Sequence, residues 1–114
     1  MEFILVDLTT KKNLDILSKI SEFIEHDFLI YFLLEPDVLK LQNIETLIKQ
    51  KFPNCEMVDK RVITFDGSTA RQYAVGFSSI KTNRLVFQSA KTIEDLKSLL
   101  KLQLINKTCK YIEL

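Results

Sequence analysis

Glycine and proline are scarce in this chain of 114 residues, which has two of each. Nucleotide-binding loops of the P-loop and Rossmann types need several glycines, because the backbone must approach the phosphates closely, so the sequence excludes both kinds of site. No glycine-rich or proline-rich stretch, low-complexity tract or internal repeat divides the chain. We therefore expect a single domain over residues 1–114, without a linker.

Residues that commonly bind metals or form covalent links are equally few. The cysteines Cys55 and Cys109 form no CxxC motif, and His26 is the one histidine. This set is too small for a disulfide framework or a zinc site, so we predict no metal and interpret the cysteines as reduced, buried thiols. His26 stands between Glu25 and Asp27 at the end of a predicted helix, which suits a cation, and no nucleophile is beside it. We predict no catalytic residue and no cofactor, which favours a non-enzymatic protein.

A long hydrophobic run is also missing. The longest apolar segment, Phe28 to Leu34, is much shorter than the roughly 20 residues that cross a bilayer. The first residues, "MEFILVDL", lack the basic region of a signal peptide and are typical of a β-strand. The sequence thus predicts a cytoplasmic protein that does not bind membranes.

Charge is balanced overall but divided along the chain. The net charge is +1, yet residues 1–59 carry 6 Lys and no Arg against 11 Asp and Glu, whereas residues 60–114 carry 10 Lys and Arg against 4 acids. All three arginines belong to the second half. Two interpretations stay open: the halves attract each other within the fold or across an oligomer, or the basic half meets an anionic partner.

Hydrophobic periodicity predicts an α+β protein. The expected elements follow the order β-α-β-α-β-β-β-α-β: strand Phe3–Leu8, a helix from Thr10 or Asn13 to Glu25, strand Phe28–Leu34, a helix from Glu35 to Phe52, strands Met57–Phe65, Arg71–Phe77 and Arg84–Gln88, helix Lys91–Leu104 and strand Cys109–Leu114. This order predicts a single mixed β-sheet of five or six strands with two to three helices packed on it, and a ferredoxin-like arrangement is possible.

Three local patterns refine that prediction. The continuously apolar segment Phe28–Leu34 favours a strand covered on both faces. The second helix should bury a stripe formed by Val38, Leu41, Ile44 or Leu47, and Ile48. Thr92 and Asp95 resemble a capping box at the start of the last helix. Whether the helices cover one or both faces of the sheet is left open.

The segment from Asp66 to Ala70 is the most glycine-dependent turn. Asp66-Gly67 between two alternating apolar runs is typical of a β-hairpin, since glycine adopts positive φ and aspartate bonds within the turn. The five-residue loop also leaves room for an anion contact. A binder of, or enzyme on, a phosphorylated small molecule at the Asp66–Arg71 loop is our third hypothesis for function.

Basic residues gather around that hairpin, in strands that also contain Tyr73 and Phe77. Sheets that present aromatic rings and cations bind single-stranded nucleic acids, although Tyr73, Val75 and Phe77 also have the spacing of core residues. Our candidate residues for contact with an anion or a nucleic acid, RNA or DNA, are Lys60, Arg61, Ser68, Thr69, Arg71, Lys81 and Arg84.

These observations leave an ordered set of hypotheses. First is a small non-enzymatic regulatory or adaptor protein that acts through protein–protein binding, as a homo-oligomer or a subunit of a complex, because the charge is asymmetric and no catalytic constellation is present. The alternative is a nucleic-acid-binding protein that uses the hairpin face from Arg61 to Arg84.

Overall fold

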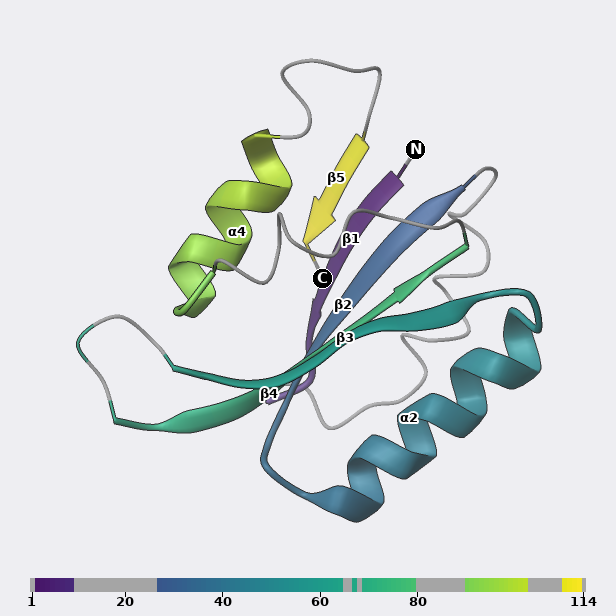
Figure 1. Cartoon of the computed structure of the whole chain (residues 1–114), viewed down its shortest axis with the longest axis horizontal. Coiled ribbons are helices and arrows are strands. Elements are labelled where there is room, and N and C mark those ends of the chain that lie inside the picture. The colour runs from purple at the N-terminus through teal and green to yellow at the C-terminus, as the bar shows by residue number, and fades with distance from the viewer. Residues whose placement is uncertain are drawn as a thin grey trace.

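The structure, a computed structural model, describes residues 2–9, 27–64, 67, 69–79, 90–102 and 110–113 (Figure 1). Its strands are β1 (Glu2–Asp7), β2 (Phe28–Leu34), β3 (Glu56–Thr64), β4 (Arg71–Ser78) and β5 (Lys110–Glu113), and its helices are α2 (Val38–Lys51) and α4 (Ile93–Leu102). The predicted α+β class is confirmed. The predicted first helix and the predicted strand Arg84–Gln88 lie outside the described residues.

One mixed sheet joins the strands in the order β3-β4-β2-β1-β5. β1 runs parallel to both β2 and β5, and β4 is antiparallel to β2 and β3. β2 therefore lies between a parallel and an antiparallel neighbour, and all seven of its residues are buried. The expectation that this apolar strand is covered on both faces is confirmed.

The two faces of the sheet carry separate cores because side chains alternate along each strand. One core contains Phe28, Ile30 and Phe32 of β2 together with the buried residues of α2, and the other contains Leu29, Tyr31 and Leu33 together with those of α4. α2 and α4 thus cover opposite faces (Figure 1). This layout does not match the ferredoxin-like alternative, in which helices share one face.

Side chains at the helix ends explain where the helices begin. Asp37 caps α2, since its Oδ1 accepts hydrogen bonds from the backbone N–H groups of Leu39 and Lys40. Thr92 caps α4 by accepting from the N–H of Asp95, whose carboxylate accepts in return from the N–H of Lys91. This pair is close to the predicted capping box, with the return bond one residue earlier.

The predicted apolar stripe of α2 is correct except at its first member. Leu41, Ile44 and Ile48 are buried, whereas Val38 is 61% exposed. Val38 lies on the same side of the helix as Leu41, but at the first helical position, and the buried core residues of α2 begin only with Leu41. Neither described helix has the length and hydrophobicity that a bilayer crossing needs.

Candidate binding face on the β3–β4 hairpin

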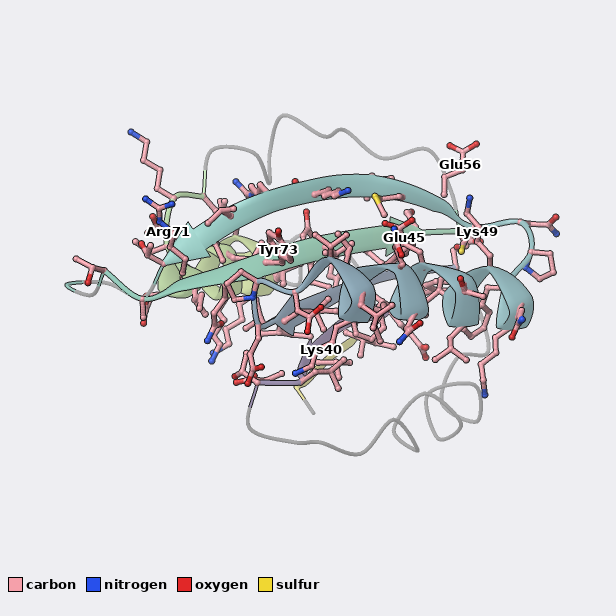
Figure 2. All side chains as sticks on the ribbon, turned by 90° about the horizontal axis from the view of Figure 1, so that it is seen from below. Lys40, Glu45, Lys49, Glu56, Arg71 and Tyr73 are labelled. Carbon is pink, nitrogen blue, oxygen red and sulfur yellow. The ribbon has the colours of Figure 1, made fainter. Side chains whose placement is uncertain are left out.

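β3 and β4 form the hairpin that the Asp-Gly signal predicts. The strands pair antiparallel from Glu56 with Ser78 to Thr64 with Arg71, and Gly67 in the connection has a φ of 70°. The antiparallel pairing confirms the hairpin interpretation of this loop. The positive φ explains why a glycine stands in the turn. The hairpin extends beyond the N-terminal end of α2 and projects from the rest of the molecule (Figures 1 and 2).

Alternation along the two strands separates their side chains into two sets. On the side of α2, Lys60 lies opposite Val75, Val62 opposite Tyr73, and Thr64 opposite Arg71. Val75 and Phe77 point to this same side and are buried in the core under α2. Residues of β4 nearer to the loop, on the same side, are less buried. We call the five residues at the outer end of this side the arm face: Lys60, Val62, Thr64, Arg71 and Tyr73.

The arm face combines exposed apolar surface with positive charge. Val62 is 52% exposed, and Tyr73 is half-buried where its ring packs against the edge of the core under α2. Lys60 and Arg71 are exposed, and Figure 2 shows Arg71 on the projecting part of the hairpin with Tyr73 nearer to the beginning of α2. An apolar pair flanked by two cations is suited to a partner that offers both apolar contact and negative charge.

The two acidic residues that follow β2, Glu35 and Asp37, lie close to the arm face and already have intramolecular roles. Leu34 pairs with Tyr73, so the residues that follow β2 lie beside this end of β4. Of those, Glu35 forms an ion pair with Lys40 at 2.8 Å, and Asp37 caps α2. Neither acid is engaged with Lys60 or Arg71, and both of these cations are exposed.

The opposite side of the same hairpin is closed by a polar cluster. The hydroxyl of Tyr31 donates a hydrogen bond of 2.7 Å to Oδ2 of Asp59, and Nε of Arg61 lies 3.2 Å from that same oxygen. Nη1 of Arg61 donates to the carbonyl of Ala90, just before α4. A register shift between Met57 and Asp59 inserts one extra residue in β3, which aims the carboxylate toward Tyr31. Arg61 is thus held within the fold.

Gly76 makes room for the Tyr31 ring across the strand pair. A Cβ atom at Gly76 would stand 2.9 Å from Cζ of Tyr31, closer than carbon atoms approach. Burial, and then the hydrogen bond to Asp59 and its negative charge, raise the pKa of the Tyr31 phenol. Tyr31 therefore stays protonated and acts as a hydrogen-bond donor to the carboxylate.

The structure places four of the seven candidate anion-contact residues. Lys60, Thr69 and Arg71 are exposed, and Lys60 and Arg71 share the arm face. Arg61, next to Lys60 in the chain, points to the other side of the hairpin and binds Asp59 and Ala90. Ser68, Lys81 and Arg84 lie outside the described residues, as do Asp66 and His26.

Metal ligands do not assemble in the part of the chain that the structure describes, where no group of three or more His, Cys, Asp or Glu side chains could hold an ion. Cys55 is buried in the core under α2, and that burial raises the pKa of its thiol, so it is an inert core residue. Cys109 lies outside the described residues.

Val62 and Thr64 are the members of the arm face that the sequence did not indicate, and Val62 is the apolar one. The run "RVITF" has ordinary strand periodicity, and nothing in it shows that Val62 and Ile63 differ in exposure. The position of Val62 could be inferred only from its pairing with Tyr73. That pairing depends on the register of the hairpin, and therefore on the extra residue in β3.

Comparison with known proteins adds no information on the arm face. The chain matches no protein family model, and no curated protein matches its sequence significantly.

Proposed function

We propose that this protein is a small non-enzymatic adaptor or regulatory protein that acts by binding another protein chain through the arm face, as a homo-oligomer or a subunit of a complex. The observation that carries the proposal is the exposed side chain of Val62, which pairs across the strands with the half-buried Tyr73. Valine on a sheet is ordinarily buried, and an exposed apolar side chain beside an aromatic ring and an arginine has the composition of a protein-binding surface.

The location of the pair supports the proposal. The β3–β4 hairpin projects beyond α2, so a partner can approach the arm face from the α2 side (Figure 2). Two further apolar side chains, Val38 and Leu39 in the first turn of α2, are 61% and 66% exposed on that side of the sheet. A partner that covered the arm face and this turn would bury apolar surface from both elements, which is the main source of binding free energy between proteins.

The test is recovery of a stoichiometric complex from the cells that make the protein. We expect the tagged full chain to purify as a homo-oligomer or with a partner in fixed ratio, measured by light scattering. Val62→Asp should abolish the complex, because a carboxylate would be buried at the interface. Ser98→Asp, the same charge change at an exposed position of α4, should leave it intact. A strictly monomeric chain without a partner, or equal behaviour of the two variants, would overturn the proposal.

A nucleic-acid-binding function is the second candidate, because Lys60 and Arg71 flank the aromatic ring of Tyr73 on one sheet surface. It predicts binding to single-stranded RNA or DNA that weakens steeply with salt and with Arg71→Ala. A mobility-shift titration at low salt that shows no complex would eliminate it.

A further inference from the structure

From the spacing of charge and apolar surface on the arm face, we propose that its partner is an extended peptide segment with the order acidic-x-apolar-x-acidic. This inference rests on the proposed protein-binding function and specifies the chemistry that the partner must have. It uses the register of β3 and β4, the exposure of Val62, and the placement of the two exposed cations Lys60 and Arg71.

The arm face has three steps along the strand direction. Lys60 stands at the first step, the pair of Val62 and Tyr73 at the second, and Arg71 with Thr64 at the third. Successive steps are two residues apart, so the cations are separated by four residue positions, or about 13 Å along the strands. The apolar pair lies midway between them.

An extended peptide repeats the same distances. Its side chains i−2, i and i+2 point to one side, and four residue positions again span about 13 Å. An apolar side chain at i can cover Val62 and Tyr73, while carboxylates at i−2 and i+2 reach Lys60 and Arg71. A helix would advance only about 6 Å over four residues, so it would bring its acids to one cation rather than both.

Charge and apolar surface together favour a peptide over a nucleic acid. A single strand of RNA would use the cations and the ring of Tyr73, but it would leave Val62 without an apolar partner, as well as the exposed side chains of Val38 and Leu39. An acidic peptide with a central aromatic residue would satisfy Lys60, Arg71 and the apolar pair at once.

The experiment is an NMR titration of the ¹⁵N-labelled full chain at low salt with the peptide Asp-Ser-Phe-Ser-Asp, capped at both ends. We expect chemical shift changes concentrated at Lys60–Thr64 and Arg71–Tyr73. The isomer Asp-Asp-Phe-Ser-Ser has the same composition with displaced acids and should bind about tenfold more weakly. Asp-Ser-Ser-Ser-Asp, which lacks the apolar anchor, should be similarly weak.

Variants of the protein test the two ends of the face. Arg71→Ala should weaken binding of the first peptide about fivefold, whereas Lys49→Ala, which removes the same charge at the far end of α2, should not (Figure 2). Equal affinity for the two isomers, or shift changes away from the arm face, would overturn the inference. Tighter binding of oligouridine at the arm face would overturn it in favour of a nucleic acid. A stoichiometric complex that needs Val62 would still uphold the proposed function in either case.

Discussion

The two sides of the β3–β4 hairpin are made by the same strands yet differ in how their polar groups are used. Toward α4, Asp59 and Arg61 are bound to each other, to Tyr31 and to the chain before α4. Toward α2, Lys60 and Arg71 extend into solvent around Val62. Lys60 and Arg61 are neighbours in sequence, so the strand alternation separates a cation that holds the fold from one that is exposed.

Contacts on the α4 side of the hairpin allow its α2 side to stay exposed. An exposed face gains no stability from burial, so the hairpin must be fixed from its other side. The cluster of Tyr31, Asp59 and Arg61 joins β2, β3 and the segment before α4, and the backbone of Thr64 also pairs with Thr92. These links tie the projecting strands to the rest of the fold, which would lower the entropy cost of binding the proposed partner.

The largest expected effect is on the closed side. Asp59→Ala should lower the free energy of unfolding by about 3 kcal/mol, because it leaves the hydroxyl of Tyr31 and the guanidinium of Arg61 buried without their shared acceptor. Urea denaturation measures this change. Lys60→Ala, one residue away on the open side, is the control, and equal losses for the two variants would erase the proposed difference between the sides.

Gly76→Ala should cost about 2 kcal/mol, because the added methyl group would collide with the Tyr31 ring. The collision disappears when the ring is removed. Gly76→Ala should therefore be much less harmful in a Tyr31→Leu background, and a double-mutant cycle by urea denaturation measures that coupling. Additive losses would show that Gly76 is needed for another reason.

The Tyr31 phenol should make stability depend on pH in the alkaline range. In the unfolded chain this phenol ionises near its ordinary pKa of 10.0, whereas the folded state raises that pKa and keeps the proton. Its stabilisation is thus complete below about pH 10 and is lost as the pH rises further, by up to about 1.4 kcal/mol per pH unit. The stability advantage of the wild type over Tyr31→Phe should shrink above that pH in urea denaturation. A constant advantage would contradict the burial of the phenol.

The smallest effects are expected on the arm face. Lys60→Ala, Val62→Thr and Arg71→Ala should each change the free energy of unfolding by no more than about 0.5 kcal/mol, because these side chains are exposed. The same substitutions should alter binding. A loss above about 2 kcal/mol for Val62→Thr would mean that this residue supports the fold rather than a partner.

Much of the fold could be predicted because each element has a local cause. The apolar run Phe28–Leu34 indicated a doubly covered strand, Asp66-Gly67 a hairpin, and Thr92 with Asp95 a helix start. These signals depend on residues close in sequence. The placement of α2 and α4 on opposite faces depends on how the crossovers pack, and no local pattern in the sequence decides it.

The candidate site was only partly predictable for the same physical reason. Lys60 and Arg61 looked alike as basic residues at the start of a charged half. Strand alternation places them on opposite sides, but which of the two turns inward depends on the extra residue in β3 and on Asp59 meeting Tyr31 from another strand. The one hint in the sequence was Tyr31 itself, since a hydroxyl inside a buried apolar run requires a partner.

The pairing of β1 with β5 has a consequence for the order of folding. Glu2 lies beside Lys110, so this contact closes a loop of almost the whole chain, whereas the β3–β4 hairpin closes a very short one. Because closing a long loop costs more entropy, the hairpin should form early and β5 should join late. In pulsed hydrogen exchange, amides of Arg71–Ser78 should gain protection before those of Lys110–Glu113, and simultaneous protection would contradict this order. A partly folded chain would then already expose the arm face before β5 had completed the edge of the sheet.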